Sequence, residues 1–388
     1  MNNKKKILIV SPFFYPEPIS TGKFNTDLVR SLSEKGHEVT VLCFHPFYPS
    51  WKSIKSNEQI EGVTIIRGGN TLIYPKKTIF RRMVLEVGFA FFVLKKLRKV
   101  QKNKDIIMPV FPPSLAFYLL LPFLNREVRK VGMIHDLQEI YSSNKKGLLN
   151  KGVKYFIHKI EKKCFNFCDK LIFLSNEMKE AAVELYQLDP IKSAVQYPFI
   201  TLKNTITNQL TTVLKPENTN VVYSGALGEK QNPTGLYNFF NYASEIIENG
   251  VFHFFSQGEV FNQLKEENKN PKILFHDLVP KENLEELYQK SDVQILPQLS
   301  NTSRGSLPSK LPNILASGCK ILVITDKNSE IENLFLSKNL HTAINSWDNE
   351  IILEALQQLL ISNSKDHNQI KVASEIFTID RLIQEILI

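Results

Sequence analysis

Cysteine is scarce in this sequence. The chain of 388 residues has four cysteines, at positions 43, 164, 168 and 319, and they form no paired framework. This pattern argues against a disulfide-stapled secreted domain and fits a reducing cytosol. Cys164 and Cys168 are four residues apart on an expected helix with His158 nearby, but a metal site there would lack a fourth ligand. We therefore interpret the pair as two small buried apolar residues, and we expect no metal.

Long apolar runs are also missing. The N-terminal segment MNNKKKILIVSPFF has a basic start but only a short apolar run, which is typical of a first β-strand rather than of a signal peptide. The longest uncharged run, residues 106–124, approaches the length of a membrane span but contains four prolines. We interpret it as a buried strand, a proline turn and an apolar helix, with a membrane span as the alternative.

Two phosphate-binding motifs are absent after the first expected strand. The loop SPFFYPEPISTGKFN resembles the end of a P-loop at Gly22 and Lys23, but the flanking positions hold Glu17 and Phe24 where that motif needs Gly and Ser or Thr. No G-x-G-x-x-G follows, which argues against a dinucleotide fold. Gly22 would let a substrate approach the backbone closely, and a helix N-terminus favours negative charge. An ordinary strand-to-helix loop with a turn glycine is the alternative.

The charge is unbalanced toward the basic side, with a formal net charge of +9. Residues 80–104, FRRMVLEVGFAFFVLKKLRKVQKNK, place basic side chains around an apolar stretch. This stretch is either a solvated helix with one buried face or a peripheral patch on anionic lipid. Nucleic acid is a third possibility, but no RNA- or DNA-binding motif supports it. We predict contact with an anionic membrane surface and no nucleic-acid partner.

Strands and helices alternate along the chain in two halves. Residues 6–14 are predicted to form a buried strand, residues 22–39 a helix ended by Gly36, and residues 38–45 the next strand. The same order restarts after a polar segment, residues 201–220. Since the chain is too long for one ordinary core, this predicts an α/β fold with two doubly wound domains. In such sheets ligands bind outside the carboxyl ends of the strands.

The first half offers a candidate His-Asp pair. MIHDLQEIYSS places His135, Asp136 and Glu139 just past the end of a buried strand. A His-Asp pair can bind a sugar hydroxyl or share a proton. A histidine with a purely structural role is the alternative.

The second half offers glycine turns. In YSGALGEKQNP, Gly225 and Gly228 keep side chains off the turn, and Lys230 with Gln231 lies near the next helix N-terminus. A diphosphate could take backbone N–H bonds there together with a lysine charge. Another strand-end turn, SQGE, contains Gly258.

The last turn, within VQILPQLSNTSRGSLPSKLPNILASG, has two cations, Arg304 and Lys310. Ser306 or Ser309 could cap the following helix, which Gly318 would end. Residues 305–318 contain no carboxylate and no histidine. This predicts an anion site without an acid or base, with a capped helix and an uninvolved lysine as the alternative.

These pieces, in this order, resemble glycosyltransferase family 4. The most specific are SGALGEKQN and LPSKLPNILASG. The closest resemblance is to the branch of bacterial surface-polysaccharide enzymes that contains colanic acid fucosyltransferases and O-antigen N-acetylfucosamine transferases. The resemblance implies a GT-B fold, with two Rossmann-like doubly wound domains facing a central cleft, residues 1–200 and 201–365. It also implies that the C-terminal domain holds most of the nucleotide-sugar, and that a helix over 366–388 packs back on the N-terminal domain.

The resemblance assigns roles residue by residue. Gly22 with Lys23 matches a glycine loop near the donor diphosphate, and His135 resembles a histidine beside the donor sugar. Residues 225–231 match the diphosphate loop. There Ala226 replaces the usual arginine, and the usual lysine position falls on Gln231, next to Lys230.

Both glutamates of the family's E-x7-E pair are missing, since Gly305 and Asn313 stand at their positions. Asn313 could still bond a ribose hydroxyl, because an amide both donates and accepts. Glu330 matches an acidic position beyond the next strand and could substitute in part. With Ser309 and Lys310, these residues predict a phosphate and ribose cradle.

The implied reaction needs little from an acid or base. Cations and helix N-termini stabilise the charge on the leaving diphosphate, which takes the acceptor's proton while positioning supplies much of the remainder. We predict a retaining, metal-independent glycosyltransferase with His135, Asp136 and Lys310 in catalytic roles. We expect no cofactor beyond a GDP- or UDP-linked donor sugar, for which the resemblance suggests a fucose type. The expected acceptor is a lipid-linked oligosaccharide of O-antigen, capsule or exopolysaccharide synthesis, at the inner face of the cytoplasmic membrane. A GT-B nucleotide-sugar epimerase and a non-catalytic partner subunit are the alternatives.

Overall fold

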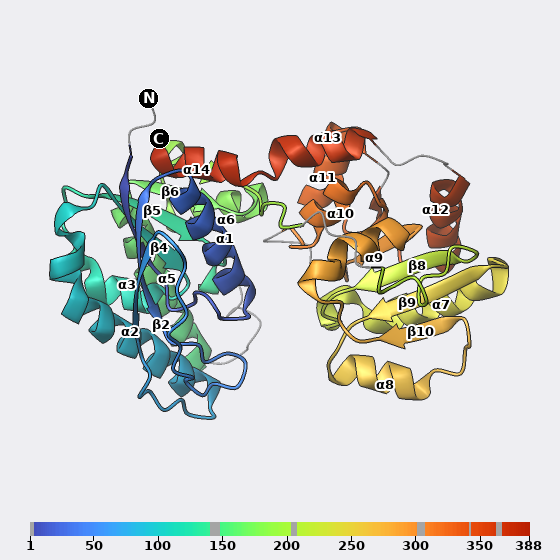
Figure 1. The fold of residues 1–388 in the computed structure, drawn as a ribbon, viewed down its shortest axis with the longest axis horizontal. Coiled ribbons are helices and arrows are strands. Elements are labelled where there is room, and N and C mark those ends of the chain that lie inside the picture. Colours follow the sequence, from blue (N-terminus) through green and yellow to red (C-terminus); the bar gives the residue numbers. More distant parts are fainter. Residues whose placement is uncertain (1–3, 140–147, 203–207, 301–306, 341–342, 362–366) are drawn as a thin grey trace. The chain divides into compact units, whose positions relative to one another are not determined.

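The computed structural model describes residues 4–139, 148–202, 208–300, 307–340, 343–361 and 367–388 (Figure 1). The chain forms two compact units. The first unit comprises Met1–Gln196 and Ile379–Ile388, and the second unit comprises Tyr197–Thr378. Both are parallel sheets interleaved with helices, which confirms the predicted α/β class.

The first unit has a parallel sheet of seven strands in the order β3-β2-β1-β4-β5-β6-β7. Its inner strands are buried over nearly their whole length because helices cover both faces of the sheet. The strands are β1 (Lys6–Val10), β2 (Glu38–Phe44), β3 (Val63–Gly68), β4 (Ile106–Phe111), β5 (Arg129–Ile134), β6 (Lys170–Phe173) and β7 (Ser193–Val195).

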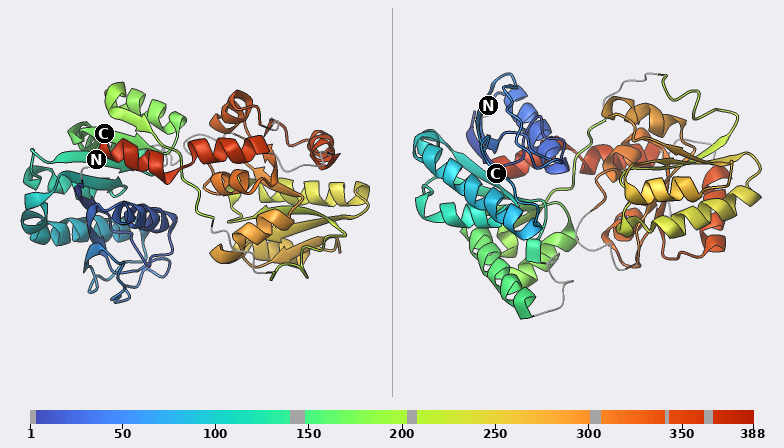
Figure 2. Two further views of the ribbon diagram at one scale, coloured as in Figure 1. Left: turned by 45° about the horizontal axis from the view of Figure 1, so that its top comes forward. Right: turned by 90° about the horizontal axis from the view of Figure 1, so that it is seen from below.

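The helices of the first unit divide between the two faces of this sheet. Helix α1 packs with α14 on one face, and α2, α3 and α5 pack side by side on the other (Figures 1 and 2). The helices are α1 (Ser20–Glu34), α2 (Thr78–Val100), α3 (Ser114–Leu120), α5 (Leu148–Phe167), α6 (Asn176–Tyr186) and α14 (Ile379–Leu387). Short 3-10 turns lie at Gln101–Asn103, Leu121–Phe123 and Pro190–Lys192.

The uncharged run at 106–124 folds as predicted. It forms β4, a turn at Pro112 and Pro113, and the buried helix α3. Among the helices that the structure describes, none combines the length and apolar character that a membrane span requires.

The tail of the chain is two helices rather than the one expected over 366–388. Helix α13 (His367–Ile376) packs on α10 (Leu311–Ser317) within the second unit, and the chain leaves helical conformation at Phe377 and Thr378. Only α14 belongs to the first unit, where Asp380 pairs with Lys35 at 2.8 Å and Glu385 pairs with Lys170 at 2.7 Å. The amphipathic pattern continues across the break, so the sequence does not reveal it.

The second unit has a parallel sheet of six strands in the order β10-β9-β8-β11-β12-β13. The strands are β8 (Thr219–Ser224), β9 (Gly250–Phe255), β10 (Ile273–His276), β11 (Val293–Pro297), β12 (Lys320–Ile324) and β13 (Ala343–Ile344). Its helices, besides α13, are α7 (Pro233–Ile246), α8 (Glu259–Glu267), α9 (Leu284–Lys290), α10 (Leu311–Ser317), α11 (Glu330–Ser337) and α12 (Asn349–Ile361). Two 3-10 turns lie at Glu229–Gln231 and Lys281–Asn283.

In each sheet the strand order reverses once, between β1 and β4 in the first unit and between β8 and β11 in the second. The carboxyl ends of the strands beside such a reversal are where doubly wound sheets bind ligands. The predicted site residues that the structure describes follow carboxyl ends of strands in both units, and some of these strands, such as β1, β8 and β11, lie beside a reversal.

The four cysteines are buried and free. Burial raises the thiol pKa of Cys164 and Cys168, as expected for small apolar core residues. Within the described residues, no three His, Cys, Asp or Glu side chains gather in a way that could hold a metal ion.

Candidate active site

At the carboxyl edge of the first sheet, the loop between β1 and α1 is closely packed. Gly22 is buried, and a Cβ at this position would lie 3.1 Å from both Cβ and the backbone oxygen of Glu17. The glycine therefore lets the loop pack against its own helix, so the space beside it is filled by protein. Lys23 is exposed, and its backbone N–H donates to Ile19 O at 3.0 Å.

Glu17 is a buried carboxylate in this loop, and its part in the fold was not predicted. Its two oxygens accept hydrogen bonds from Phe47 N at 3.0 Å and Tyr48 N at 2.6 Å. Burial raises the pKa of Glu17, while these two backbone bonds oppose that rise. Glu17 thus ties the loop after β1 to the aromatic loop after β2. The signal in the sequence that could have pointed to this role is the one acidic residue within an aromatic, proline-rich loop.

His135 brings two distant parts of this edge together. Its ring meets the ring of Phe24, in the first turns of α1, edge to face at a centroid distance of 4.7 Å. Its Nε2 is buried and has no hydrogen-bond partner within the part of the chain that the structure describes. Burial lowers the pKa of His135 to about 4, so the imidazole is neutral near pH 7. A neutral imidazole here can bond a hydroxyl but does not supply positive charge.

The acidic residues that follow His135, unlike its Nε2, have hydrogen-bond partners among the residues that the structure describes. Asp136 accepts a hydrogen bond from Leu137 N at 2.9 Å. Glu139 points to α5, where its carboxylate lies 2.8 Å from His158 Nδ1. Glu161 on α5 accepts bonds from the backbone N–H groups of residues 138 and 139 and from Tyr186 Oη at 2.6 Å. These two glutamates hold the turn after β5 in place.

At the carboxyl edge of the second sheet, Lys310 lies beside the Gly225 turn. Its Nζ donates to Ser224 O at 2.8 Å and lies 4.1 Å from the centroid of the Tyr223 ring. A Cβ on Gly225 would be 3.6 Å from this Nζ. Gly225 has φ +129°, which favours glycine. The segment that follows β8 and the segment that follows β11 therefore meet at the carboxyl ends of these neighbouring strands, although they lie far apart in the sequence.

The surroundings of this lysine affect its charge. Lys310 is half-buried as a residue, with its Nζ turned inward to the end of β8. Desolvation lowers the pKa of Lys310 to about 7, so the ammonium and amine forms are both populated at neutral pH. An anion bound beside Gly225 would favour the ammonium form and would receive a largely desolvated charge.

The remaining part of the glycine loop is organised as a cap. Gly228 N donates to Gln231 Oε1 at 3.0 Å, and Gln231 N donates to Gly228 O at 2.9 Å. Asn232 then caps α7, since its side chain accepts from Gly235 N at 3.2 Å. The side chain of Lys230 is exposed, and its backbone oxygen accepts from Leu299 N at 2.7 Å. Gln231 therefore shapes the loop, while Lys230 lies at its surface.

Asn313, the expected ribose contact, is engaged within the protein. Its Oδ1 accepts from Thr201 N at 2.8 Å and its Nδ2 donates to Thr201 Oγ1 at 3.1 Å. Ser309 is exposed, and Glu330 is buried at the first position of α11.

Two further predicted positions complete the second edge. Gly258, at φ +113°, precedes α8, and a Cβ at this position would meet no heavy atom of the described residues within 4 Å. The backbone of Gly258 is therefore open to a ligand. Arg304 lies outside the described residues, as do Gly305 and Ser306.

Comparisons with known proteins agree with this picture. Residues 21–204 match the family model described as Glycosyltransferase Family 4. A provisionally named colanic acid biosynthesis glycosyl transferase, WcaI, of Escherichia coli (strain K12) is 25% identical over 356 residues, which is 85% of each chain.

Solved structures resemble the chain over nearly its whole length. Sucrose-phosphate synthase from Thermosynechococcus elongatus has a TM-score of 0.73 at 14% identity, with 99% of this chain and 98% of that chain covered. Anabaena Alr3699/HepE in complex with UDP and glucose has a TM-score of 0.66 at 12% identity, with 99% and 98% covered. The family match over residues 21–204, the curated relative and the two-sheet fold together show that this chain is similar to family 4 glycosyltransferases and has the GT-B fold.

Proposed function

We propose that this protein is a retaining glycosyltransferase that transfers a fucose-type sugar from a GDP- or UDP-linked donor to a lipid-linked oligosaccharide. The product would belong to a bacterial O-antigen, capsule or exopolysaccharide. The relative named for colanic acid biosynthesis supports a polysaccharide product. The neighbour that holds UDP and glucose supports a nucleotide-sugar donor. The observation that carries the donor site is the meeting of Lys310 with the Gly225 turn.

The second edge supplies the groups that the leaving diphosphate needs. Negative charge grows on the diphosphate as the glycosidic bond breaks, and preorganised cations and N–H groups stabilise that charge. Lys310 offers a largely desolvated ammonium, and Gly225 and Gly258 offer backbone that no side chain of their own covers. The acceptor hydroxyl attacks the face that the diphosphate leaves, and the diphosphate takes its proton. The proposal therefore requires no metal ion.

The first edge supplies neutral hydrogen-bonding groups. His135 Nε2 lacks a partner among the described residues, and its imidazole stays neutral well below pH 7. A neutral imidazole suits a sugar hydroxyl better than a phosphate, because a hydroxyl can both donate and accept. His135 therefore orients a hydroxyl in this scheme, and it does not act as the proton acceptor.

The experiment that tests the function measures release of nucleoside diphosphate from a panel of GDP- and UDP-linked sugars. Transfer predicts release only when a membrane extract containing the lipid-linked acceptor is present, with the product's anomeric configuration matching that of the donor by NMR. An epimerase would convert the donor sugar or release nucleoside diphosphate without acceptor. Donor binding with no turnover on any extract would favour the partner-subunit alternative.

Helix α2 carries the proposed membrane contact, residues 80–104. Two of its cations already have protein partners: Arg81 lies 4.2 Å from the centroid of the Trp51 ring, and Arg82 Nε lies 2.9 Å from Glu86 Oε1. The cations available to lipid are those of the C-terminal half, Lys95, Lys96, Arg98 and Lys99, all of which are exposed. Co-sedimentation with anionic vesicles tests this contact, and retention of binding after these four residues are neutralised would contradict it.

A further inference from the structure

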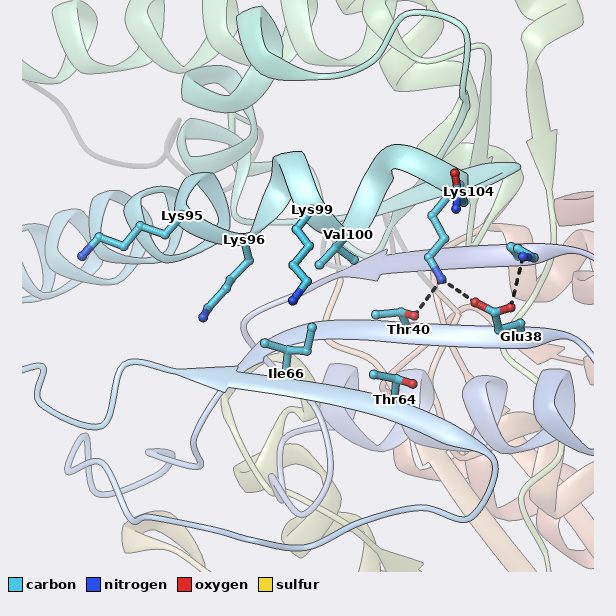
Figure 3. A pocket seen from close by; sticks show the side chains of 11 residues that line it. Glu38, Thr40, Thr64, Ile66, Lys95, Lys96, Lys99, Val100 and Lys104 are labelled. Carbon is cyan, nitrogen blue, oxygen red and sulfur yellow. Dashed lines mark hydrogen bonds and ion pairs between the residues drawn. The ribbon is translucent and has the colours of Figure 1, made fainter.

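A hollow in the first unit lies between the C-terminal half of α2 and the edge strands of the sheet (Figure 3). It has a volume of about 480 Å³, and five of the residues that line it are lysines: Lys6, Lys95, Lys96, Lys99 and Lys104. Lys6 and Glu38 begin β1 and β2, so the hollow lies at the amino ends of these strands. The hollow therefore lies at the opposite end of the strands from His135, and it is separate from the candidate active site.

The one acid that lines the hollow is already neutralised. Glu38 Oε1 lies 3.0 Å from Lys104 Nζ, and its Oε2 lies 3.6 Å from Lys6 Nζ. These cations lower the pKa of Glu38, with Lys104 as the main cause. Lys104 also donates to Thr40 Oγ1 at 2.8 Å. One carboxylate thus balances at most one of the two lysines that hold it.

The other three lysines add positive charge without a partner. Lys95, Lys96 and Lys99 form no ion pair with any residue that the structure describes. Lys96 and Lys99 extend from α2 toward β3, on the same side as the ammonium group of Lys104 (Figure 3). Like charges held around a concave wall repel one another, so an anion between them is stabilised by several lysines at once. Lysine ammonium groups suit phosphate as compact point charges.

The same helix presents apolar side chains to solvent. Phe80, Met83 and Phe91 are 55%, 50% and 62% exposed. Phe80 and Phe91 are eleven residues apart, or about three helical turns, so they lie on one face. Arg98 follows Phe91 by seven residues, about two further turns, on that face. Exposed aromatic side chains next to basic ones are the composition of a helix that lies in a membrane interface. If the hollow bound a soluble phosphate, these exposed apolar side chains would have no part in the binding.

We propose that the lysine hollow binds the exposed phosphate group of an anionic lipid headgroup while the Phe80–Phe91 face of α2 enters the membrane surface. The inference rests on the membrane contact proposed above and gives it headgroup selectivity. A terminal phosphate reaches into the hollow, whereas the phosphodiester of a bulkier headgroup is shielded. The first unit is thereby held at the membrane through the edge of its sheet that is remote from His135.

The experiment compares binding to phosphatidylcholine vesicles that contain phosphatidic acid or phosphatidylserine, matched for zeta potential. The full-length protein, the hollow variant Lys96→Gln/Lys99→Gln and the control variant Arg98→Gln/Lys102→Gln are each sedimented with both vesicles. Both variants lose two charges from the segment formed by the end of α2 and the 3-10 turn after it, and Lys102 and Arg98 do not line the hollow. We expect the wild type to prefer phosphatidic acid by about 25-fold, from roughly fivefold for each of the two lysine contacts. The control lacks Arg98 of the membrane-facing side, so it should bind both vesicles more weakly but keep this preference. The hollow variant should lose the preference.

Other outcomes separate the parts of the proposal. Equal binding of the wild type to both vesicles would overturn the headgroup site and leave the membrane contact standing. No binding to either vesicle would overturn both, while acceptor-dependent transfer in the assay above would be unaffected. Calorimetric binding of inorganic pyrophosphate that the hollow variant loses, without any vesicle preference, would overturn the lipid site in favour of one for a soluble anion. Unchanged thermal unfolding of both variants is the control for folding.

Discussion

The carboxyl edges of the two sheets are built from the same topology but carry opposite chemistry. The first edge holds buried carboxylates that bond backbone N–H groups, together with a neutral histidine whose Nε2 has no partner among the described residues. The second edge holds a half-buried lysine beside a glycine turn with positive φ. Hydroxyls suit the first set of groups and phosphates suit the second. In the proposed function, hydroxyl recognition is therefore assigned to the first edge and diphosphate recognition to the second.

The largest expected effect tests whether the carboxylates of the first edge are structural. Glu161→Ala removes the acceptor for Tyr186 Oη and for two backbone N–H groups, so we expect the free energy of unfolding to fall by about 3 kcal/mol. Urea denaturation measures it. Glu184→Ala, on the exposed face of α6, is the control and should change it by less than about 0.5 kcal/mol. Wild-type stability with lost turnover would instead make Glu161 a functional acid.

The next effect concerns the pH response of the first edge. His135 has a folded pKa of about 4, below its ordinary value of 6.5, so it stabilises the fold above pH 6.5 and loses that contribution as the pH falls toward 4. His135→Asn should therefore remove about 3 kcal/mol of the acid-induced loss of stability. His253 in the second unit, with a pKa of about 3, remains as an internal reference. An unchanged pH dependence in the variant would contradict the neutral state of His135.

A matched pair of glycines tests the second edge. Gly225→Ala places a side chain at φ +129°, which costs about 1–2 kcal/mol of strain and crowds the approach to Lys310. We expect nucleoside diphosphate binding to weaken about tenfold, as measured by calorimetry. Gly228 has φ −117°, which any residue adopts, so Gly228→Ala should bind nearly as the wild type does. Equal effects of the two substitutions would remove the special role of the Gly225 turn.

The smallest effect concerns Asn313. Because both ends of its amide bond Thr201, Asn313→Ala should lower stability by about 1 kcal/mol and leave nucleotide affinity nearly unchanged. Urea denaturation and calorimetry measure the two quantities. A large loss of affinity with unchanged stability would restore the ribose contact that the family resemblance predicts.

Local patterns predicted most of the fold. The alternation of apolar strands and amphipathic helices indicated the α/β class, and Gly318 ends α10 at φ +72° as predicted. The sequence did not predict the contacts between segments that lie far apart along the chain. The bonds of Glu17 to residues 47 and 48 and of Asn313 to Thr201 depend on how loops return to the sheet. The break between α13 and α14 is set by packing, because the apolar period runs through it.

The candidate site was predicted unevenly for the same reason. The sequence pointed to Lys310 and the Gly225 turn through their positions after strand ends, and the structure brings the two together. It did not foresee that Gly22 packs against Glu17 or that Lys310 is desolvated enough for its pKa to fall to about 7. Desolvation depends on the neighbours that the fold assembles, which no local motif encodes.

Calorimetric titration of UDP and GDP into Lys310→Ala and Lys230→Ala tests the central claim most directly. The ammonium group of Lys310 is held beside the Gly225 turn, whereas Lys230 lies exposed in the same loop region, so the pair separates a positioned charge from a surface charge. We predict that Lys310→Ala weakens the preferred nucleotide at least about tenfold while Lys230→Ala changes affinity less than about threefold. Wild-type affinity in a folded Lys310→Ala variant would contradict the assignment of the donor diphosphate to the second edge.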